Sequence, residues 1–571
     1  MSKIEMLSVV FFMSLLCQGL SVVSFGKEFI TAFPENIAFY FPQDSRNALK
    51  ITAFHNDTIV TVTFNFTDRN ITLHSGQTNI LNFPKDVEVC FFMSSQKSVK
   101  IVSNKIIVVL WISQRGDSVQ TNVVQPTPNL GTRYSIAALN YNAMTASSIE
   151  ESTLFAQNSL RYGSVRLIII NAMNITNTIS VQIVSTNGQK DNNFTLSPYE
   201  LYQFSTSGSA TMVYSSNKVA LLLTHPCAET TICGCNMVVS QILPMDMWGN
   251  EFVVPSLRNM STAWLHVTST TKDTDKNLIR TLIQSNSSEL IPFPDLDVKS
   301  QYITAPNNVS LRLISPGIII ELIPVTMFGA CFLVQFNSTQ GEAFVIAEDR
   351  DKHNVHIDNG LLSTSVWRNI SKSNYSTKSV PLDGTHIIWH PTSKIGVYMF
   401  ERMVSGIVYG GPAILLNEQP DHDGCVAEGV EFITATDLMT WPESHQYCLN
   451  GSYQMFSPTN KMAQDKMTMW LQKNANQEDI WIGLRRSLLT EEWYWQIGNE
   501  SVRNVNYTLW ADGHPVEPQN ALCASVSPQA GRNFFWKSVR CCFKLRPVCF
   551  KSATYFNEIT FEMVDFNISA V

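Results

Sequence analysis

Residues 25–416 alternate short apolar runs with polar, turn-forming clusters. The apolar runs are rich in Val, Ile and Leu, and the clusters between them are rich in Asn, Gly, Ser and Pro. β-Branched and aromatic side chains suit the pleated, half-buried surface of a strand, whereas the clusters favour turns. The clearest runs lie at residues 59–64, 106–111, 165–170, 219–223 and 317–322. The pattern predicts an all-β region with little helix.

A polar turn followed by a buried strand recurs four times in this region. The polar triplets that precede the strands begin at Ser103, Ser216, Ser315 and Thr392. They are therefore 113, 99 and 77 residues apart. A second similarity follows the first two strands: residues 125–131 and residues 243–249 share a proline near their start and a glycine at their end. We interpret the pattern as tandem β-sandwich-like units of about a hundred residues, with propeller-like blades as the alternative, although chance similarity of turn sequences would also explain it.

Helical signals appear only after a short polar linker at residues 417–424. Thr440 and Glu443 form a capping-box pattern, with Pro442 in the first turn, and predict a helix that carries Tyr447 and Cys448. Residues 461–473 have loosely amphipathic spacing and predict a second helix. Strand-rich sequence follows. We therefore expect an α+β domain over residues 425–551 and a carboxyl-terminal tail over residues 552–571.

Length and composition favour a folded, multidomain chain. The 571 residues are too many for one core, and 44% of them are hydrophobic, 11% aromatic and 15% charged. The net charge of −7 is spread thinly and no basic run stands out. Nucleic acid is therefore not expected as a partner.

The first 24 residues read as a secretory signal peptide. Lys3 precedes an apolar run at residues 7–17, and compact residues at 22–24 predict cleavage after Ser24. The best later apolar stretch, residues 311–327, is interrupted by two charges and two prolines, and the tail lacks a GPI-type hydrophobic end. We expect a secreted, extracellular protein without a membrane anchor.

Asn-x-Ser/Thr sequons are dense, as expected of a glycoprotein exposed to the secretory pathway. The fifteen candidate asparagines are Asn56, Asn65, Asn70, Asn174, Asn193, Asn259, Asn286, Asn308, Asn337, Asn369, Asn374, Asn450, Asn499, Asn506 and Asn567.

Cysteine usage also fits an oxidising compartment. Removal of Cys17 with the signal peptide leaves eleven cysteines, an odd number, so at least one thiol is free or bonded to another chain. The tightest cluster consists of His225, Cys227, Cys233 and Cys235, with Cys90 and Cys331 elsewhere in the region. Its spacing would allow a metal site, but a secreted chain oxidises its thiols, so disulfides are the favoured interpretation.

Several segments of the β region resemble a known family. The opening residues 26–34 (GKEFITAFP), the Cys227/Cys233 loop, and the QILP and Trp248-Gly249 that follow it resemble the amino-terminal domain of IgG Fc-binding protein. The resemblance covers residues 26–410 and implies a domain found in secreted and mucus-associated proteins. No individual residue can be assigned to antibody Fc binding.

The carboxyl-terminal region resembles the C-type lectin-like domain. The supporting motifs occur in order: TW-x-x-S-x-x-YC, WIGL at residues 481–484, WYW at 493–495, and W-x-x-G-x-P from Trp510. The resemblance spans residues 425–551 and implies two disulfides, which join Cys448 to Cys549 and Cys523 to Cys541. Cys542 is then surplus.

The partner of Cys542 stays open. It could reach Cys425, or it could bridge to another chain and form a disulfide-linked oligomer. A bond to Cys425 would leave the odd thiol among Cys90, Cys227, Cys233, Cys235 and Cys331.

Sugar binding in this family depends on calcium held by Glu-Pro-Asn or Gln-Pro-Asp in a long loop and by Trp-Asn-Asp on a late strand. Calcium is a hard cation that takes six to eight oxygen ligands. This chain has HPV at residues 514–516 and WKS at 536–538. Val516 offers no side-chain oxygen and Lys537 brings a cation, so we expect neither the usual calcium site nor another cofactor. The candidate ligand contacts are Glu517, Gln519, Asn520, Trp536 and Lys537.

Catalytic motifs are not found. The chain contains no HExxH, GxSxG or P-loop pattern, and the eleven histidines are scattered. We therefore expect a recognition or adhesion protein that binds an extracellular protein or glycan in innate defence, mucus or matrix, and not an enzyme. The alternatives are a disulfide-linked structural component of matrix or mucus, and a true lectin whose non-standard site uses Glu517 and Asn520.

Overall fold

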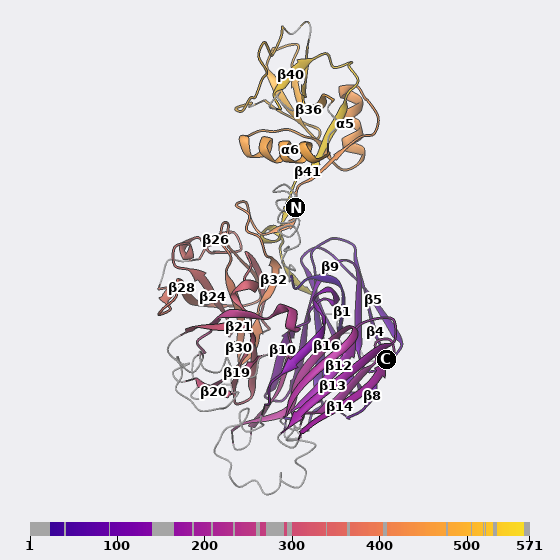
Figure 1. Ribbon diagram of the computed structural model, residues 1–571. Coiled ribbons are helices and arrows are strands. Elements are labelled where there is room, and N and C mark those ends of the chain that lie inside the picture. Colours follow the sequence, from indigo (N-terminus) through magenta and orange to yellow (C-terminus); the bar gives the residue numbers. More distant parts are fainter. Residues whose placement is uncertain are drawn as a thin grey trace, which may run out of the picture. The chain divides into compact units, whose positions relative to one another are not determined.

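The computed structural model (Figure 1) is mainly β, with many antiparallel sheets and a carboxyl-terminal α+β fold, as predicted. It describes residues 23–564 apart from 39–41, 91, 140–164, 186–187, 207–208, 232–233, 258–262, 270–289, 294–299, 338–339, 363–365, 404–407, 475–477, 504, 518, 520 and 529–533. The chain divides into two compact units. The first comprises residues up to Cys425 together with those from Tyr555 onward, and the second is Val426–Thr554.

The first unit consists of four β modules in chain order. The first module contains β1 (Gly26–Thr31), β2 (Phe33–Pro34), β3 (Arg46–Ala53), β4 (Thr58–Phe64), β5 (Thr67–Leu73), β6 (Gln77–Phe83), β7 (Glu88–Val89), β9 (Val99–Arg115) and β10 (Ser118–Val123). The second contains β11 (Gly131–Ile136), β12 (Arg166–Asn171), β13 (Asn177–Ser185), β14 (Gly188–Leu196), β15 (Leu201–Ser205), β16 (Ala210–Thr231) and β17 (Gly234–Gln241), and its sheet also includes β8 (Ser94–Ser95).

The last two modules are smaller. The third contains β18 (Gly249–Val254), β19 (Ala263–Thr268), β20 (Leu290–Phe293), β21 (Gln301–Ser315) and β22 (Ile318–Leu322). The fourth contains β23 (Cys331–Gln335), β24 (Gly341–Glu348), β25 (His356–Ile357), β26 (Gly360–Leu361), β27 (Arg368–Asn369), β28 (Tyr375–Leu382), β29 (Thr385–Trp389), β30 (Gly396–Arg402), β31 (Val408–Pro412) and β32 (Ile414–Asn417).

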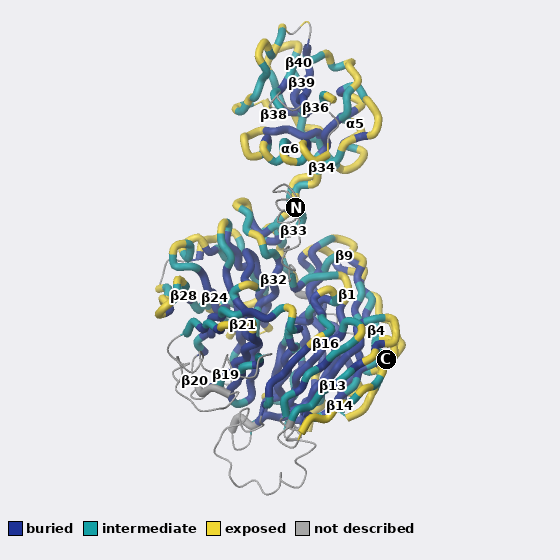
Figure 2. The backbone as a smooth tube through the Cα atoms, viewed as in Figure 1, coloured by how far each residue is buried: buried dark blue, intermediate teal, exposed yellow. Residues whose placement is uncertain are grey.

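One long strand organises each of the first three modules. In the first module, the early half of β9 pairs with β1 and β4, and its late half pairs with β3 and β10. The strands β16 and β21 change partners halfway in the same manner. Buried side chains from both sets of partners form one core, for example Phe29 and Val60 with Leu49 and Leu81. This two-layer arrangement agrees with the sandwich-like units that the sequence predicts. Figure 2 shows that long stretches of the strands in the first unit are buried.

A glycine at the start of each of these modules packs against a proline near its end. A Cβ atom on Gly26 would lie 2.7 Å from Cβ of Pro126, and one on Gly131 would lie 2.4 Å from Cβ of Pro244. Gly249 and Pro324 repeat the contact, also at 2.4 Å. Only glycine allows the backbone to approach so closely. The similar segments at residues 125–131 and 243–249 contain both members of the second contact, Gly131 and Pro244, and one member each of the first and the third, Pro126 and Gly249.

The four modules meet around a common centre. The strands β10, β17, β22 and β31 each form a hairpin with the strand that precedes them, β9, β16, β21 and β30, and they contact one another in a closed ring. They surround a cavity of about 70 Å³ whose lining includes Thr121, Gln241, Glu321 and Gly410. The modules are therefore arranged radially, as the propeller-like alternative anticipated, although the first three are each built in two layers.

The residues after Lys551 are not a simple tail. Phe556 is fully buried and its ring lies 4.6 Å from that of Phe54. The strand β43 (Glu562–Val564) then pairs in parallel with β6. The second unit is thus inserted between two segments of the first.

The second unit contains two helices and a curved sheet. The helices are α5 (Trp441–Asn450) and α6 (Lys461–Asn474), and the strands are β33 (Val426–Glu428), β34 (Glu431–Thr434), β35 (Gln454–Met455), β36 (Ile480–Arg486), β37 (Trp493–Ile497), β38 (Glu500–Val502), β39 (Cys523–Val526), β40 (Trp536–Val539), β41 (Arg546–Lys551) and β42 (Thr554–Tyr555). The predicted capping box starts α5, because the amide of Thr440 donates to Glu443 Oε2 at 2.8 Å. Both predicted helices are confirmed: α5 begins at the predicted capping box and carries Tyr447 and Cys448, and α6 matches the predicted residues 461–473 to within one residue.

Tryptophans fill the core of the second unit. Trp441, Trp481, Trp495 and Trp536 are each at most 2% exposed. Three of these indole N–H groups have acceptors: Ile482 O for Trp441, Met439 O for Trp481 and Gln464 Oε1 for Trp536. Partnered in this way, an indole can be buried without an unsatisfied donor.

Within the part of the chain that the structure describes, no helix is both long and apolar enough to cross a bilayer.

Candidate recognition site

Two disulfides hold the second unit together. Cys448 of α5 is bonded to Cys549 of β41, with Cα atoms 5.4 Å apart. Cys523 of β39 is bonded to Cys541, which follows β40, with Cα atoms 5.2 Å apart. These are the pairs that the lectin resemblance implies. The second of them fixes the start of β39, where the long loop, residues 503–522, ends.

Cys425 does not pair with Cys542, which was one of the two alternatives for Cys542. Cys425 is bonded to Cys331 instead, because β32 pairs with β23 and returns the chain to the start of β23. Cys542 is an exposed free thiol, and Cys90 is a half-buried one.

The cysteines near His225 are not available together as thiolate ligands for a metal ion. Cys227 is bonded to Cys235, which confirms the preference for a disulfide, while Cys233 lies outside the described residues. The ring Nδ1 of His225 accepts a hydrogen bond from the amide of Cys227 at 3.2 Å. Across the described ranges, no group of three or more His, Cys, Asp or Glu side chains could hold a metal ion.

The positions that correspond to the calcium ligands are joined by direct protein contacts. His514 precedes a cis proline, and its Nδ1 accepts a hydrogen bond from the amide of Ser538 at 3.1 Å. The hydroxyl oxygen of Ser538 accepts a bond from the amide of Val516 at 2.8 Å. The long loop is therefore closed onto β40 by these hydrogen bonds.

The charges at the same place are unfavourable for a cation. Lys537 forms an ion pair with Asp479, with 2.9 Å between Nζ and Oδ2. Partial burial, together with the Lys537 charge, lowers the pKa of His514. A calcium ion needs several carboxylate and amide oxygens. The residues at these positions do not fit that requirement.

The predicted ligand contacts differ in accessibility. Glu517 and Gln519 are exposed, and Asn520 lies outside the described residues. Trp536 is fully buried and packs edge-on against Trp495 and Trp510, so its assignment as a ligand contact is wrong. Burial of the indole removes its large apolar surface from water and leaves none of it accessible to a ligand.

An exposed apolar hairpin tip lies beside the long loop. Leu488 and Leu489, between β36 and β37, are 74% and 97% exposed. Arg486, at the base of this hairpin, donates from Nη1 to Val516 O at 3.4 Å and so connects the hairpin to the long loop. We call Leu488, Leu489, Val516 and Glu517 the loop surface. The adjacent leucines in a polar turn were the available sequence signal for it.

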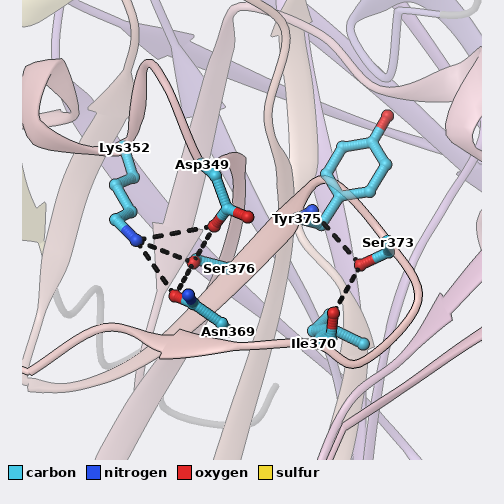
Figure 3. A network of polar contacts seen from close by, with 7 residues as sticks. All are labelled: Asp349, Lys352, Asn369, Ile370, Ser373, Tyr375 and Ser376. Atoms are coloured by element: carbon cyan, nitrogen blue, oxygen red, sulfur yellow. Dashed lines mark hydrogen bonds and ion pairs between the residues drawn. The ribbon is translucent and has the colours of Figure 1, made fainter.

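The sequon asparagines are consistently accessible. All twelve that lie in the described ranges are exposed, whereas Asn259, Asn286 and Asn567 lie outside those ranges. Two neighbouring sequons of the fourth module share a polar network (Figure 3). Asn369 Oδ1 accepts hydrogen bonds from Ser376, the hydroxyl residue of the Asn374 sequon, at 2.8 Å and from Lys352 Nζ at 3.0 Å.

Comparison with known families identifies both parts of the chain. A family model described as IgGFc binding protein matches residues 120–290, and one described as Lectin C-type domain matches residues 437–551. The matches place an IgGFc-binding domain within residues 120–290 and a C-type lectin domain within residues 437–551. Both families are binding domains.

Individual relatives agree with this division. The human IgGFc-binding protein is 24% identical over 397 residues, which cover 66% of this chain but 7% of that protein. C-type lectin 1 of Hydrophis hardwickii is 26% identical over 106 residues, which cover 18% of this chain and 62% of the lectin. Among solved structures, human lithostathine is 23% identical and covers 22% of this chain and 85% of its own, with a TM-score of 0.20.

Proposed function

We propose that this protein is a secreted glycoprotein that acts in recognition or adhesion through its C-type lectin domain, without the usual calcium-dependent sugar site. The observation that supports this most directly is the closure of the loop by His514, Val516 and Ser538, with Lys537 at the position of a ligand. The exposed leucines of the loop surface provide an apolar contact area for a protein or glycan ligand. The setting would be innate defence, mucus or matrix.

Secretion is supported by independent features. These are the apolar run at residues 7–17, which we propose to be part of a signal peptide over residues 1–24, the four disulfides among the described residues, and the exposure of the described sequons. We further propose that the IgGFc-binding region, residues 25–416, and the linker, residues 417–424, present the lectin domain, residues 425–551. We also propose that the protein is not an enzyme, because both matching families are binding domains.

The test is binding by the full-length secreted protein. Glycan arrays and candidate proteins, including IgG Fc because of the name of the human relative, are probed with calcium and with chelator. We expect a ligand whose binding is unchanged by chelator and is at least tenfold weaker in Leu489→Ser. Met469→Ser, an exposed position on α6, is the matched control. Sugar binding that disappears with chelator would contradict the proposal and favour a non-standard calcium lectin.

A second candidate function is a disulfide-linked component of matrix or mucus. It is favoured by the exposed free thiol of Cys542. Non-reducing electrophoresis of the secreted protein would then reveal oligomers that Cys542→Ser abolishes. A protein that is monomeric under non-reducing conditions would contradict this alternative.

A further inference from the structure

A buried lysine lies against the side chain of an asparagine that is 287 residues distant in sequence. Lys50 of β3 is 0% exposed. Its Nζ lies 3.4 Å from Oδ1 of Asn337 and 3.4 Å from the carbonyl oxygen of Phe336. The contact joins the first module to the fourth.

A buried carboxylate holds the other side of the same amide. Glu401 of β30 is 4% exposed. Its Oε2 accepts a hydrogen bond from the amide N–H of Asn337 at 2.8 Å, and its Oε1 accepts one from the side-chain Nδ2 at 3.3 Å. The Asn337 carboxamide is therefore held between an amine and a carboxylate.

The amine is suited to act as a nucleophile. Burial lowers the pKa of Lys50 to about 8, although the charge of Glu401 opposes the effect. A larger share of this lysine is thus the free amine near neutral pH than for a solvated lysine. Neighbouring contacts fix the geometry, because Gln335 Nε2 donates to Thr52 Oγ1 at 2.8 Å, two residues along β3 from Lys50.

We propose that Lys50 and Asn337 form an intramolecular isopeptide bond that covalently joins the first and fourth modules. The Nζ of Lys50 attacks Cγ of Asn337, a new C–N bond forms, and the bond from Cγ to Nδ2 breaks. Glu401 accepts a proton from the attacking nitrogen and delivers it to Nδ2, which leaves as ammonia. The reaction needs no oxidant or cofactor, and its acceleration comes from holding the buried amine of Lys50 and the buried carboxylate of Glu401 against the side-chain amide of Asn337, which is itself exposed.

Asn337 is also a sequon asparagine, so two modifications compete for it. A glycan would be attached to Nδ2, the atom that leaves when the isopeptide bond forms. One molecule can therefore carry one modification or the other at this residue. The variant Thr339→Ala removes the sequon and retains the amide, which makes the cross-link measurable without this competition.

The test is mass spectrometry of tryptic peptides from the full-length protein and from Thr339→Ala. We expect a branched peptide that contains both Lys50 and Asn337, with a mass lower than the sum of its two peptides by one ammonia. Trypsin should not cleave after the acylated Lys50. Recovery from Thr339→Ala of linear peptides cleaved after Lys50, with unmodified Asn337, would overturn the proposal.

Substitutions of single residues test which side chains take part in forming the isopeptide bond. Lys50→Arg and Glu401→Gln should lose the branched peptide, while Lys100→Arg, on β9, should retain it. Asn337→Asp should form the same bond but with loss of water in place of ammonia, which only this chemistry predicts. A branched peptide that persists in Glu401→Gln would remove Glu401 from the mechanism. The measurement on Thr339→Ala decides the proposal even where another variant fails to fold.

Discussion

At the residue scale, single buried polar side chains connect the modules of the first unit. Asn236 of β17 is 0% exposed, and its Oδ1 accepts bonds from the amide of Val119 at 2.9 Å and from Ser118 Oγ at 3.2 Å. Its Nδ2 donates to Gly317 O at 2.8 Å. One side chain thus satisfies backbone groups of the first and third modules from a position in the second.

We expect Asn236→Ala to lower the free energy of unfolding by about 3 kcal/mol, because it leaves buried donors and an acceptor without partners. Chemical denaturation of the full-length protein measures the change. Asn192→Ala, at a half-buried position on β14, should cost less than about 0.5 kcal/mol. Equal effects of the two variants would show that the inter-module bonds of Asn236 contribute little.

We expect His386, in the fourth module, to make the free energy of unfolding depend on pH. The hydrogen bond between His386 Nδ1 and Asp358 Oδ2, 2.8 Å long, raises the pKa of His386 against the opposing effect of burial. Stability from this group is fully present below the ordinary histidine pKa of 6.5 and is lost as the pH rises through the raised folded value. Asp358→Asn should flatten the dependence of unfolding free energy on pH over this window. An unchanged pH profile in the variant would contradict the assignment.

At the element scale, the return of the chain after the lectin domain completes the first unit. The strand β43 covers one edge of the sheet at β6, and Phe556 fills a space beside Phe54 and Phe25. An exposed sheet edge favours association between chains, so β43 both stabilises the unit and protects this edge.

Phe556→Ala should cost about 3 to 5 kcal/mol of stability, since it removes a fully buried aromatic side chain. Phe543→Ala is the matched control, because Phe543 is 51% exposed. Thermal and chemical denaturation distinguish the two variants. A Phe556→Ala protein as stable as the Phe543→Ala protein would mean that the segment after Lys551 does not pack as described.

At the scale of the whole molecule, the disulfides lie within the units. Cys331–Cys425 and Cys227–Cys235 belong to the first unit, and the two lectin disulfides belong to the second. Among the described cysteines, this leaves Cys90 and Cys542 as thiols with different accessibility.

Alkylation of the native, unreduced protein should label Cys542 fastest. Cys90 should react more slowly, because it is half buried and burial raises its pKa. Cys331 and Cys425 should be labelled only after reduction. Peptide mapping after brief exposure to iodoacetamide measures the order, and labelling of Cys425 before reduction would contradict the pairing.

Much of the secondary structure could be predicted, because the local spacing of apolar and polar residues follows from which side of each strand or helix is buried. The apolar runs indicated the strands, Thr440 and Glu443 marked the start of α5, and the four lectin cysteines were paired through their family resemblance. The pairing of Cys425 and the burial of Trp536 were missed. Both depend on which distant segments become neighbours, and sequence periodicity carries no information about that choice.

The sequence by itself determined the alternation of strands and turns, the two helices, the repeated proline and glycine positions in residues 125–131 and 243–249, and the presence of Val516 and Lys537 where the lectin resemblance implies calcium ligands. Only the tertiary structure decided that the modules close into a ring, that the chain returns to β6 after the lectin domain, and that Lys50 meets Asn337. The physical reason is the range of the interactions: propensity and capping act within a few residues, whereas these contacts join segments hundreds of residues apart, whose proximity exists only once the whole core has packed.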